Sequence, residues 1–161
     1  MRPKRSGIDK AILPLILAVL DTNVLVSALC LPGSLPAELL RRWLAWEFIL
    51  ILSESILAEL ADVLARPKFA RRYAMTPEKA QAFTGILWEL ATVVPGEMVV
   101  EAVPADPRDN HVIACAVEGG ANIIVSGDRH LKDMGAYDAI RILSPAQFRD
   151  FLLEAQEVIL E

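Results

Sequence analysis

Two acidic residues directly follow apolar runs that have the composition of buried strands. Asp21 comes after Leu15 to Leu20, and Asp128 follows the run Asn122 to Ser126 after one glycine. In an open parallel sheet, ligands bind beyond the carboxyl ends of the strands, so both acids stand where a site would form. A carboxylate there is costly to bury unless it is hydrogen-bonded, neutralised or bound to a cation. Either acid alone is typical of a hydrogen-bonded turn, but two of them at two strand ends indicate a site.

A third acid, Asp109, lies at the start of a helix that the sequence predicts from Pro107. It shares a helical stripe with Ile113 and Ala116, so its side chain is expected to point inward, toward the strand ends. The spacing also fits a capping pair, with Asp106 as the N-cap and Asp109 three residues on, both favoured by the helix dipole. The two interpretations are compatible. We take Asp106 as the cap and Asp109 as the functional acid.

Glu59 lies on the helix predicted after the second apolar run. It falls about 100° from the centre of the buried stripe, at the border between core and solvent, where a lone glutamate is an ordinary surface residue. Together, however, four converging carboxylates would repel one another, and Mg²⁺ or Mn²⁺, which prefer hard oxygen ligands, would relieve the repulsion. Cations held in this way can lower the pKa of a bound water and stabilise the charge that develops on a phosphodiester. The set therefore predicts hydrolysis at phosphate without a covalent intermediate.

The elements that must position these acids alternate short apolar runs with amphipathic helices. We expect strands at 15–20, 48–52, 122–126 and 139–143, an irregular extended stretch at 92–103, and helices at 36–46, from Ser53 or Ser55 to 66, 76–90, 107–118 and from Ser144 onward. Strands separated by helices imply βαβ units and a mostly parallel sheet, so the predicted fold is α/β, a three-layer α/β/α sandwich. No repeat or linker divides the 161 residues. We expect one domain over 1–161, with its core at about 15–152.

Composition adds further limits. A hydrophobic fraction of 54% favours a sheet that is buried on both faces. The only two cysteines, Cys30 and Cys115, lie far apart and are expected to be reduced thiols.

Residues 1–14 form a basic and apolar leader that resembles a signal peptide, but the apolar run is too short to span a bilayer and enters Asp21 without a cleavage site. We interpret the run as a strand in a cytoplasmic protein without a membrane segment, and we assign the leader no role. The net charge of −5 argues weakly against broad electrostatic binding to nucleic acid.

Four segments together resemble a known family. They are LDTNVLVSAL (20–29), SESILAELADVLARPKF (53–69), DPRDNHVIACAVEGGANIIVSGD (106–128) and RILSPAQFRDFL (141–152). Each motif alone is weak, but all four in this order and spacing resemble the PIN-domain family, from about Leu15 to Leu152. More narrowly, they are similar to its bacterial and archaeal branch of VapC-like toxin components of toxin–antitoxin systems.

The resemblance implies a metal-dependent endoribonuclease that uses Mg²⁺ or Mn²⁺. Four positions match the metal-binding and catalytic acids of the family: Asp21, Glu59, Asp109 in the D-x-x-D-N element, and Asp128 in the T/S-G-D element. Ser126 stands where the family often has Thr and would hydrogen-bond a carboxylate or a metal-bound water. Asn23 would brace the loop of the first acid. All four acids are present, so nothing in the sequence indicates a degenerate site.

The resemblance also implies partners: an RNA substrate, a small antitoxin protein and a second copy of the chain in a homodimer. Arg129 and Lys132 directly follow Asp128 and could line the same cleft. A second basic set could contact RNA phosphates or could simply be a solvated helix face; it comprises Arg66, Lys68, Arg71 and Arg72.

Two other functions are compatible with parts of the pattern. A phosphatase of the haloacid-dehalogenase type also has an Asp after its first strand, but it normally needs a second acid two residues later, where this chain has Asn23. A non-catalytic module that binds RNA or protein would not need the intact acids. No G-x-x-x-x-G-K or G-x-G-x-x-G is present, so nucleotide-cofactor functions have no support.

Overall fold

The computed structural model describes residues 15–100 and 107–160, and of residues 107–109 it describes the backbone alone. The predicted leader at 1–14 and the predicted cap Asp106 therefore lie outside the described residues. Within these ranges, six strands form one sheet in the order β3-β2-β1-β4-β6-β5. The strands are β1 (Leu17–Leu20), β2 (Ile49–Ser53), β3 (Thr92–Val94), β4 (Ile123–Val125), β5 (Ala136–Tyr137) and β6 (Ile140–Leu143).

All neighbouring strands are parallel except β5 and β6, so the prediction of a mostly parallel sheet is confirmed. The short β5 was not predicted. It forms an antiparallel edge with β6, to which it is joined by a turn with Asp138 at φ 49°. Because β1 is flanked by β2 and β4, its carboxyl end lies at the centre of the sheet edge where a site is expected.

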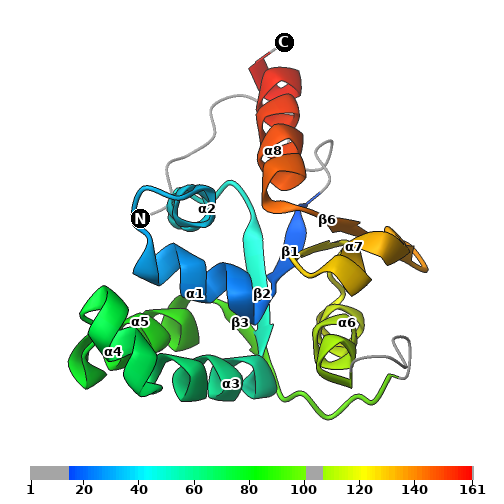
Figure 1. The fold of residues 1–161 in the computed structure, drawn as a ribbon. Coiled ribbons are helices and arrows are strands. Elements are labelled where there is room, and N and C mark those ends of the chain that lie inside the picture. The colour runs from blue at the N-terminus through cyan, green and yellow to red at the C-terminus, as the bar shows by residue number, and fades with distance from the viewer. Residues whose placement is uncertain (1–14, 101–106, 161) are drawn as a thin grey trace.

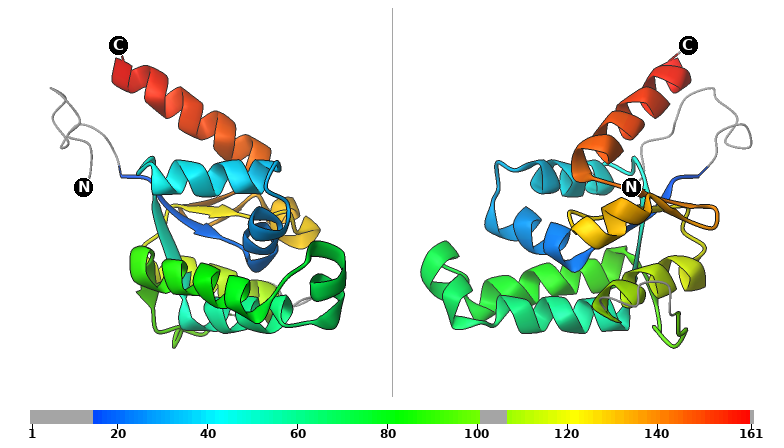
Figure 2. Two further views of the ribbon diagram at one scale, coloured as in Figure 1. Left: turned by 90° about the vertical axis from the view of Figure 1, so that its left-hand side faces the viewer. Right: turned by 45° about the vertical axis from the view of Figure 1, so that its right-hand side comes forward.

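Helices cover both faces of the sheet and complete the expected three layers (Figures 1 and 2). They are α1 (Thr22–Cys30), α2 (Leu35–Leu44), α3 (Glu54–Leu64), α4 (Pro67–Tyr73), α5 (Pro77–Leu90), α6 (Pro107–Gly119), α7 (Arg129–Met134) and α8 (Pro145–Leu160). The left view of Figure 2 shows α2 and α8 on one side of the sheet and α3, α5 and α6 on the other. In Figure 1, the later part of α8 extends away from the other elements.

The helix starts follow the capping residues in the sequence. Ser53, not Ser55, caps α3, with its hydroxyl accepting a hydrogen bond from the Ile56 N–H at 3.1 Å. Thr76 caps α5 through the N–H of Lys79, as the sequence predicts. These caps satisfy backbone donors that have no partner inside the helix, which fixes where each helix begins.

Three helices escaped the sequence analysis. The first, α1, has a polar stripe of only Asn23 and Ser27 and is rich in β-branched residues, and its burial against the other elements overrides that weak helix propensity. The second, α4, begins at Pro67, directly after the helix that we expected to end at 66, and a proline is well suited to a first helical position. The third, α7, is a six-residue helix after β4.

The sheet is buried on both faces, as the composition predicted. Ala18, Val19 and Leu20 of β1 are fully inaccessible to solvent, and one apolar cluster runs along the chain from Ala18 to Leu152. None of the helices in the described part of the chain is by itself long and apolar enough to cross a membrane, and α1 and α2 meet that measure only as a pair bent by 96°.

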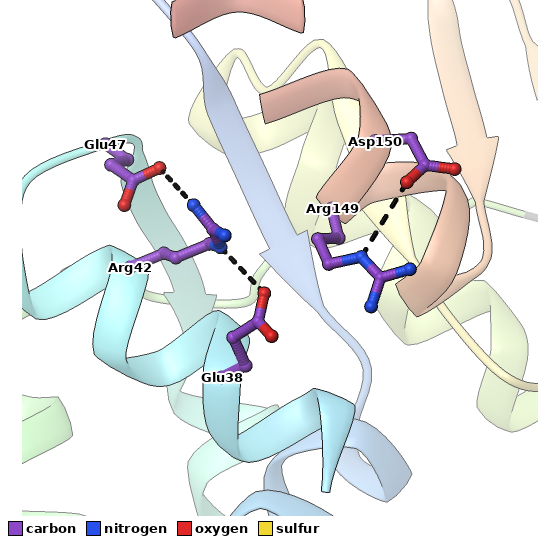
Figure 3. Close-up of polar contacts among 5 residues, drawn as sticks. All are labelled: Glu38, Arg42, Glu47, Arg149 and Asp150. Atoms are coloured by element: carbon purple, nitrogen blue, oxygen red, sulfur yellow. Dashed lines mark hydrogen bonds and ion pairs between the residues drawn. The ribbon is translucent and has the colours of Figure 1, made fainter. Parts of the chain in front are cut away.

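Two arginines on the outer helices form ion pairs with nearby carboxylates (Figure 3). Arg42 of α2 lies between Glu38 and Glu47, at 2.9 Å from each, and so fastens the turn from α2 into β2. On α8, Arg149 lies 3.7 Å from Asp150. These arginines have carboxylate partners, whereas Arg71 and Arg72 of α4 form no ion pair with any residue that the structure describes.

Candidate active site

Asp21 occupies the carboxyl end of the central strand β1. Its N–H donates to the Val125 carbonyl at 2.9 Å, which extends the pairing of β1 with β4 by one residue. Its carbonyl accepts from the N–H groups of Val24 and Leu25, so the backbone of Asp21 starts α1. Its side chain makes no capping bond, and only 7% of the residue is exposed. The carboxylate is thus left to face the neighbouring strand end.

Ser126 connects the two strand-end acids. Its hydroxyl donates to Oδ2 of Asp21 at 2.7 Å and accepts from the backbone N–H of Asp128 at 2.9 Å. Ser126 is fully buried, and its own N–H donates to Leu143 on β6. The side chain therefore makes the carboxylate contact that the sequence analysis expected of it.

The electrostatics of the site centre on Asp21. Burial, the largest cause, raises the pKa of the Asp21 carboxyl above its ordinary value of 3.8. Hydrogen bonds from the Ser126 hydroxyl and the Thr22 N–H act to lower that pKa, while the negative charges of Glu59 and Asp128 raise it further. Glu59 and Asp128 are therefore close enough to act on the charge of Asp21. A cation at this position would relieve both the burial and the repulsion.

Glu59 reaches the site from the second turn of α3. It is partly buried, as expected for a residue at the border of the apolar stripe. Its Oε2 accepts a hydrogen bond from the hydroxyl of Thr22 at 2.8 Å, and Thr22 is itself 3% exposed. The sequence analysis missed Thr22, although its place directly after Asp21 was a usable signal. Thr22 holds Glu59 beside the end of β1.

Asp128 has the turn-forming role that its position allowed, and it lies near Asp21 as well. Its Oδ1 accepts from the N–H groups of His130 and Leu131, at 2.8 and 3.3 Å, and so caps α7. Within the described residues, its Oδ2 and the Oε1 of Glu59 accept no hydrogen bond. Each of these two carboxylates thus keeps one oxygen that a hard cation could bind.

The remaining predicted acid, Asp109, belongs to the first turn of α6, but its side chain is outside what the structure describes. By helical spacing it shares the stripe of Ile113 and Ala116, which are both fully buried. Among the residues with described side chains, no three acids, histidines or cysteines are grouped closely enough to hold a metal ion. The oxygen donors suit Mg²⁺ or Mn²⁺, and the described ones do not by themselves complete a site.

The other residues that the sequence predicted for the site or for RNA binding lie on α1, on α7 and at the start of α4. Asn23 is exposed on the first turn of α1. Arg129 and Lys132 are exposed on α7, next to Asp128. Arg66 and Lys68 lie elsewhere, at the start of α4.

Cysteine chemistry has no support at this site. Burial raises the pKa of the Cys115 thiol to about 12, so the thiol stays protonated at neutral pH. Cys115 lies on α6 among core residues, and Cys30 at the end of α1 is also a free thiol. Cys115 is therefore a residue of the core.

The comparison with protein families decides the assignment. Residues 17–130 match a family model described as the PIN domain. The chain belongs to the PIN-domain family. The matched PIN segment includes Asp21, Glu59, Asp109 and Asp128. No curated protein sequence matches this PIN domain.

A solved structure shares the PIN fold. A chain of the crystal structure of VapBC2 from Rickettsia felis, bound to a DNA fragment from their promoter, superposes with a TM-score of 0.55. The match covers 80% of the present chain and 98% of that chain, at 15% sequence identity. At this identity the similarity is one of fold.

Proposed function

We propose that this PIN domain is a metal-dependent endoribonuclease that acts in the cytoplasm as the toxin component of a toxin–antitoxin pair. The observation that carries the proposal is Asp21, a carboxylate buried at the end of the central strand with two further acids close enough to raise its pKa. A fold gains nothing from such an arrangement unless the charge is used, because burial and repulsion both disfavour it. A buried acid with a perturbed pKa at a strand end is typical of functional sites.

In this proposal, Mg²⁺ or Mn²⁺ is held by Asp21, Glu59, Asp109 and Asp128. The bound cation would supply an acidic water and would stabilise negative charge on the phosphodiester. The residues of the chain prepare that site. Ser126 orients the Asp21 carboxylate, Thr22 orients Glu59, and the capping bonds of Asp128 fix one of its oxygens and leave the other accessible.

The exposed cations of α7 fit a role in holding the substrate. Arg129 and Lys132 follow Asp128 within one turn of helix, and both are exposed. Among the described residues, Arg129 forms one long ion pair, with Asp133 at 3.9 Å, and both side chains are exposed, so this pair holds the guanidinium weakly. We propose that these two residues contact the RNA phosphates that lie nearest to the acids.

A cleavage assay tests the enzymatic proposal. The purified protein should cleave single-stranded RNA with Mg²⁺ or Mn²⁺ and should not cleave it in EDTA. The Asp21→Asn/Asp109→Asn double variant should be inactive, and Asp62→Asn is the matched control because Asp62 is an exposed acid on the same helix as Glu59. Cleavage that persists in EDTA or in the double variant would refute the proposal.

The partner proposal is separate. The VapBC2 structure from Rickettsia felis is a complex bound to promoter DNA. We propose by analogy that this chain binds a small antitoxin encoded beside it, and that it forms a homodimer. Co-purification of the adjacent gene product with this chain would support the pair. An adjacent region without a small reading frame would count against it, and a monomer in light scattering would refute the dimer.

A further inference from the structure

A basic segment lies outside the acidic site, on and just before α4. The chain has 16 lysines and arginines against 21 acids, yet four of those cations fall within residues 66–72. No acid occurs between Asp62 and Glu78. An acidic protein thus concentrates positive charge at one short helix, where it creates a local field of opposite sign to the net charge.

The cations of α4 have no ion-pair partners among the described residues. Lys68, Arg71 and Arg72 are exposed, and among the described residues the segment forms one ion pair, a long one of 3.6 Å between Arg66 and Asp62. In this they differ from Arg42, which is held between two glutamates (Figure 3). No described carboxylate pairs with Lys68, Arg71 or Arg72, and their exposed side chains can be reached from solvent.

Aromatic rings lie between these cations. The centroids of Phe69 and Tyr73 are 5.8 Å apart, with their planes tilted by 32°. Lys68 stands 5.3 Å from the centre of the Phe69 ring, and Arg72 stands 5.4 Å from that of Tyr73. Together with Arg71, these residues line an open hollow of about 400 Å³. These five residues, which we call the α4 cluster, offer both positive charge and the faces of aromatic rings.

The core holds this helix in place. Phe69 packs against the apolar cluster, and Met75, just past the end of α4, is buried. Ala74 adopts a left-handed conformation with φ 51°, which ends the helix, and the Met75 N–H donates back to the Phe69 carbonyl. The exposed cations therefore project from an anchored helix.

The α4 cluster is connected to the acidic site by α3, the helix that carries Glu59. Glu59 lies on α3 five residues before that helix ends at Leu64, about 7.5 Å along its axis. α4 begins three residues later, at the end of α3 and α5 that lies away from α6 (Figures 1 and 2). A chain of nucleotides bound at the acids could thus continue along α3 to α4.

We infer that α4 is a docking surface for single-stranded nucleic acid, in which Lys68, Arg71 and Arg72 bind phosphates and Tyr73 stacks on a base. Unpaired cations interleaved with aromatic rings are the two components of single-strand binding without sequence preference. The inference rests on the proposed function, because it names how the substrate strand of that site is held. An acidic peptide would use the cations alone and would leave the ring surface without a role.

Equilibrium binding separates this inference from catalysis. The probe is a fluorescein-labelled single-stranded RNA of about ten nucleotides, a length within the usual site size of such surfaces. Fluorescence anisotropy is measured in EDTA, so no cleavage is needed. A protein that binds through α4 but never cleaves would refute the proposed function and leave this inference standing. A protein that cleaves but whose binding ignores α4 would refute this inference alone.

Charge variants test the phosphate contacts. Arg71→Gln/Arg72→Gln should weaken binding and should lower the slope of log Kd against log salt by about 1.4, the value for two phosphate contacts to a single strand. The matched control, Arg41→Gln/Arg149→Gln, loses the same charge elsewhere on the surface and should leave that slope unchanged. Equal slopes and equal losses for the two variants would overturn the inference.

Tyr73 tests the stacking contact. Tyr73→Phe keeps the ring and should bind as the wild type does, while Tyr73→Ala should weaken binding by about five-fold or more. Circular dichroism checks that both variants keep the fold. Equal affinity of the two Tyr73 variants would remove the stacking role. An oligo-aspartate peptide that competes as well as unlabelled RNA of the same charge would overturn the assignment to nucleic acid.

Discussion

Replacing Ser126 by alanine tests whether the Asp21 carboxylate depends on its one side-chain hydrogen bond. The bond is 2.7 Å long and lies between a fully buried hydroxyl and a carboxylate that is 7% exposed. A hydrogen bond to a charged group contributes about 1.5–3 kcal/mol, and Ser126→Ala also removes the acceptor of the Asp128 N–H. We expect the free energy of unfolding to fall by about 2–4 kcal/mol, equivalent to a Tm lower by roughly 4–16 °C for a chain of this size.

The assay is urea unfolding followed by tryptophan fluorescence, since Trp43 is buried and reports the core. Ser53→Ala is the matched control, because Ser53 is also a buried serine but bonds to the Ile56 N–H instead of a site acid. In an Asp21→Asn background, Ser126→Ala should be less costly by about 1 kcal/mol or more, since a neutral hydrogen bond is weaker than a charged one. Ser53→Ala should show no such coupling to Asp21→Asn.

The pH dependence adds a second readout for Ser126. The hydroxyl stabilises the ionised form of Asp21, so its contribution is present above the folded pKa of that acid and shrinks as the pH falls through it. The cost of Ser126→Ala should therefore be smaller near pH 4 than near pH 7. Additive effects of Ser126→Ala and Asp21→Asn within about 0.5 kcal/mol, with no dependence on pH, would refute the reasoning.

Three further predictions follow from the same site. Because burial raises the pKa of Asp21 in the folded state, the ionised acid weakens the fold at neutral pH; metal-free Asp21→Asn should unfold at higher urea than the wild type, and the difference should close as the pH falls toward 3.8. Asp128→Ala should lower the free energy of unfolding by about 0.5–2 kcal/mol, because the α7 cap is lost, whereas Asp128→Asn keeps the cap. Both variants should lose cleavage, but only the alanine variant should show a lower Tm in thermal unfolding. Thr22→Val removes the hydrogen-bond donor to the partly exposed Glu59, so the free energy of unfolding in urea should fall by about 1 kcal/mol and cleavage should slow. A normal cleavage rate would count against a role of Thr22 in positioning Glu59.

Much of the fold was predictable because burial leaves a clear pattern in this sequence. The strands around Val19, Leu50 and Ile124 are short apolar runs in a sheet covered on both faces, and Ser53 and Thr76 mark helix starts by their side chains. Helix α1 was not predictable from periodicity, because its polar stripe is limited to Asn23 and Ser27 and most of the helix is buried by its neighbours.

The candidate site was predictable in its position more than in its contacts. Asp21 and Asp128 follow from strand ends, but the sequence alone could not decide whether Asp128 caps a helix or lies in the site, and the structure gives it the capping bonds while placing its charge near Asp21. The hydrogen bond from Thr22 to Glu59 joins residues 37 positions apart, so it depends on the packing of α1 against α3, which local patterns do not contain.

The most direct test of the account is a titration of the protein with Mn²⁺, followed by electron paramagnetic resonance of the free ion. The account predicts that the wild type and Asp62→Asn remove Mn²⁺ from solution with the same affinity. It also predicts that Asp21→Asn, which keeps the fold and loses the central charge, binds Mn²⁺ at least ten-fold more weakly, a difference of about 1.4 kcal/mol. Equal binding by all three proteins, or no binding by the wild type, would contradict the claim that these acids form a metal-dependent nuclease site.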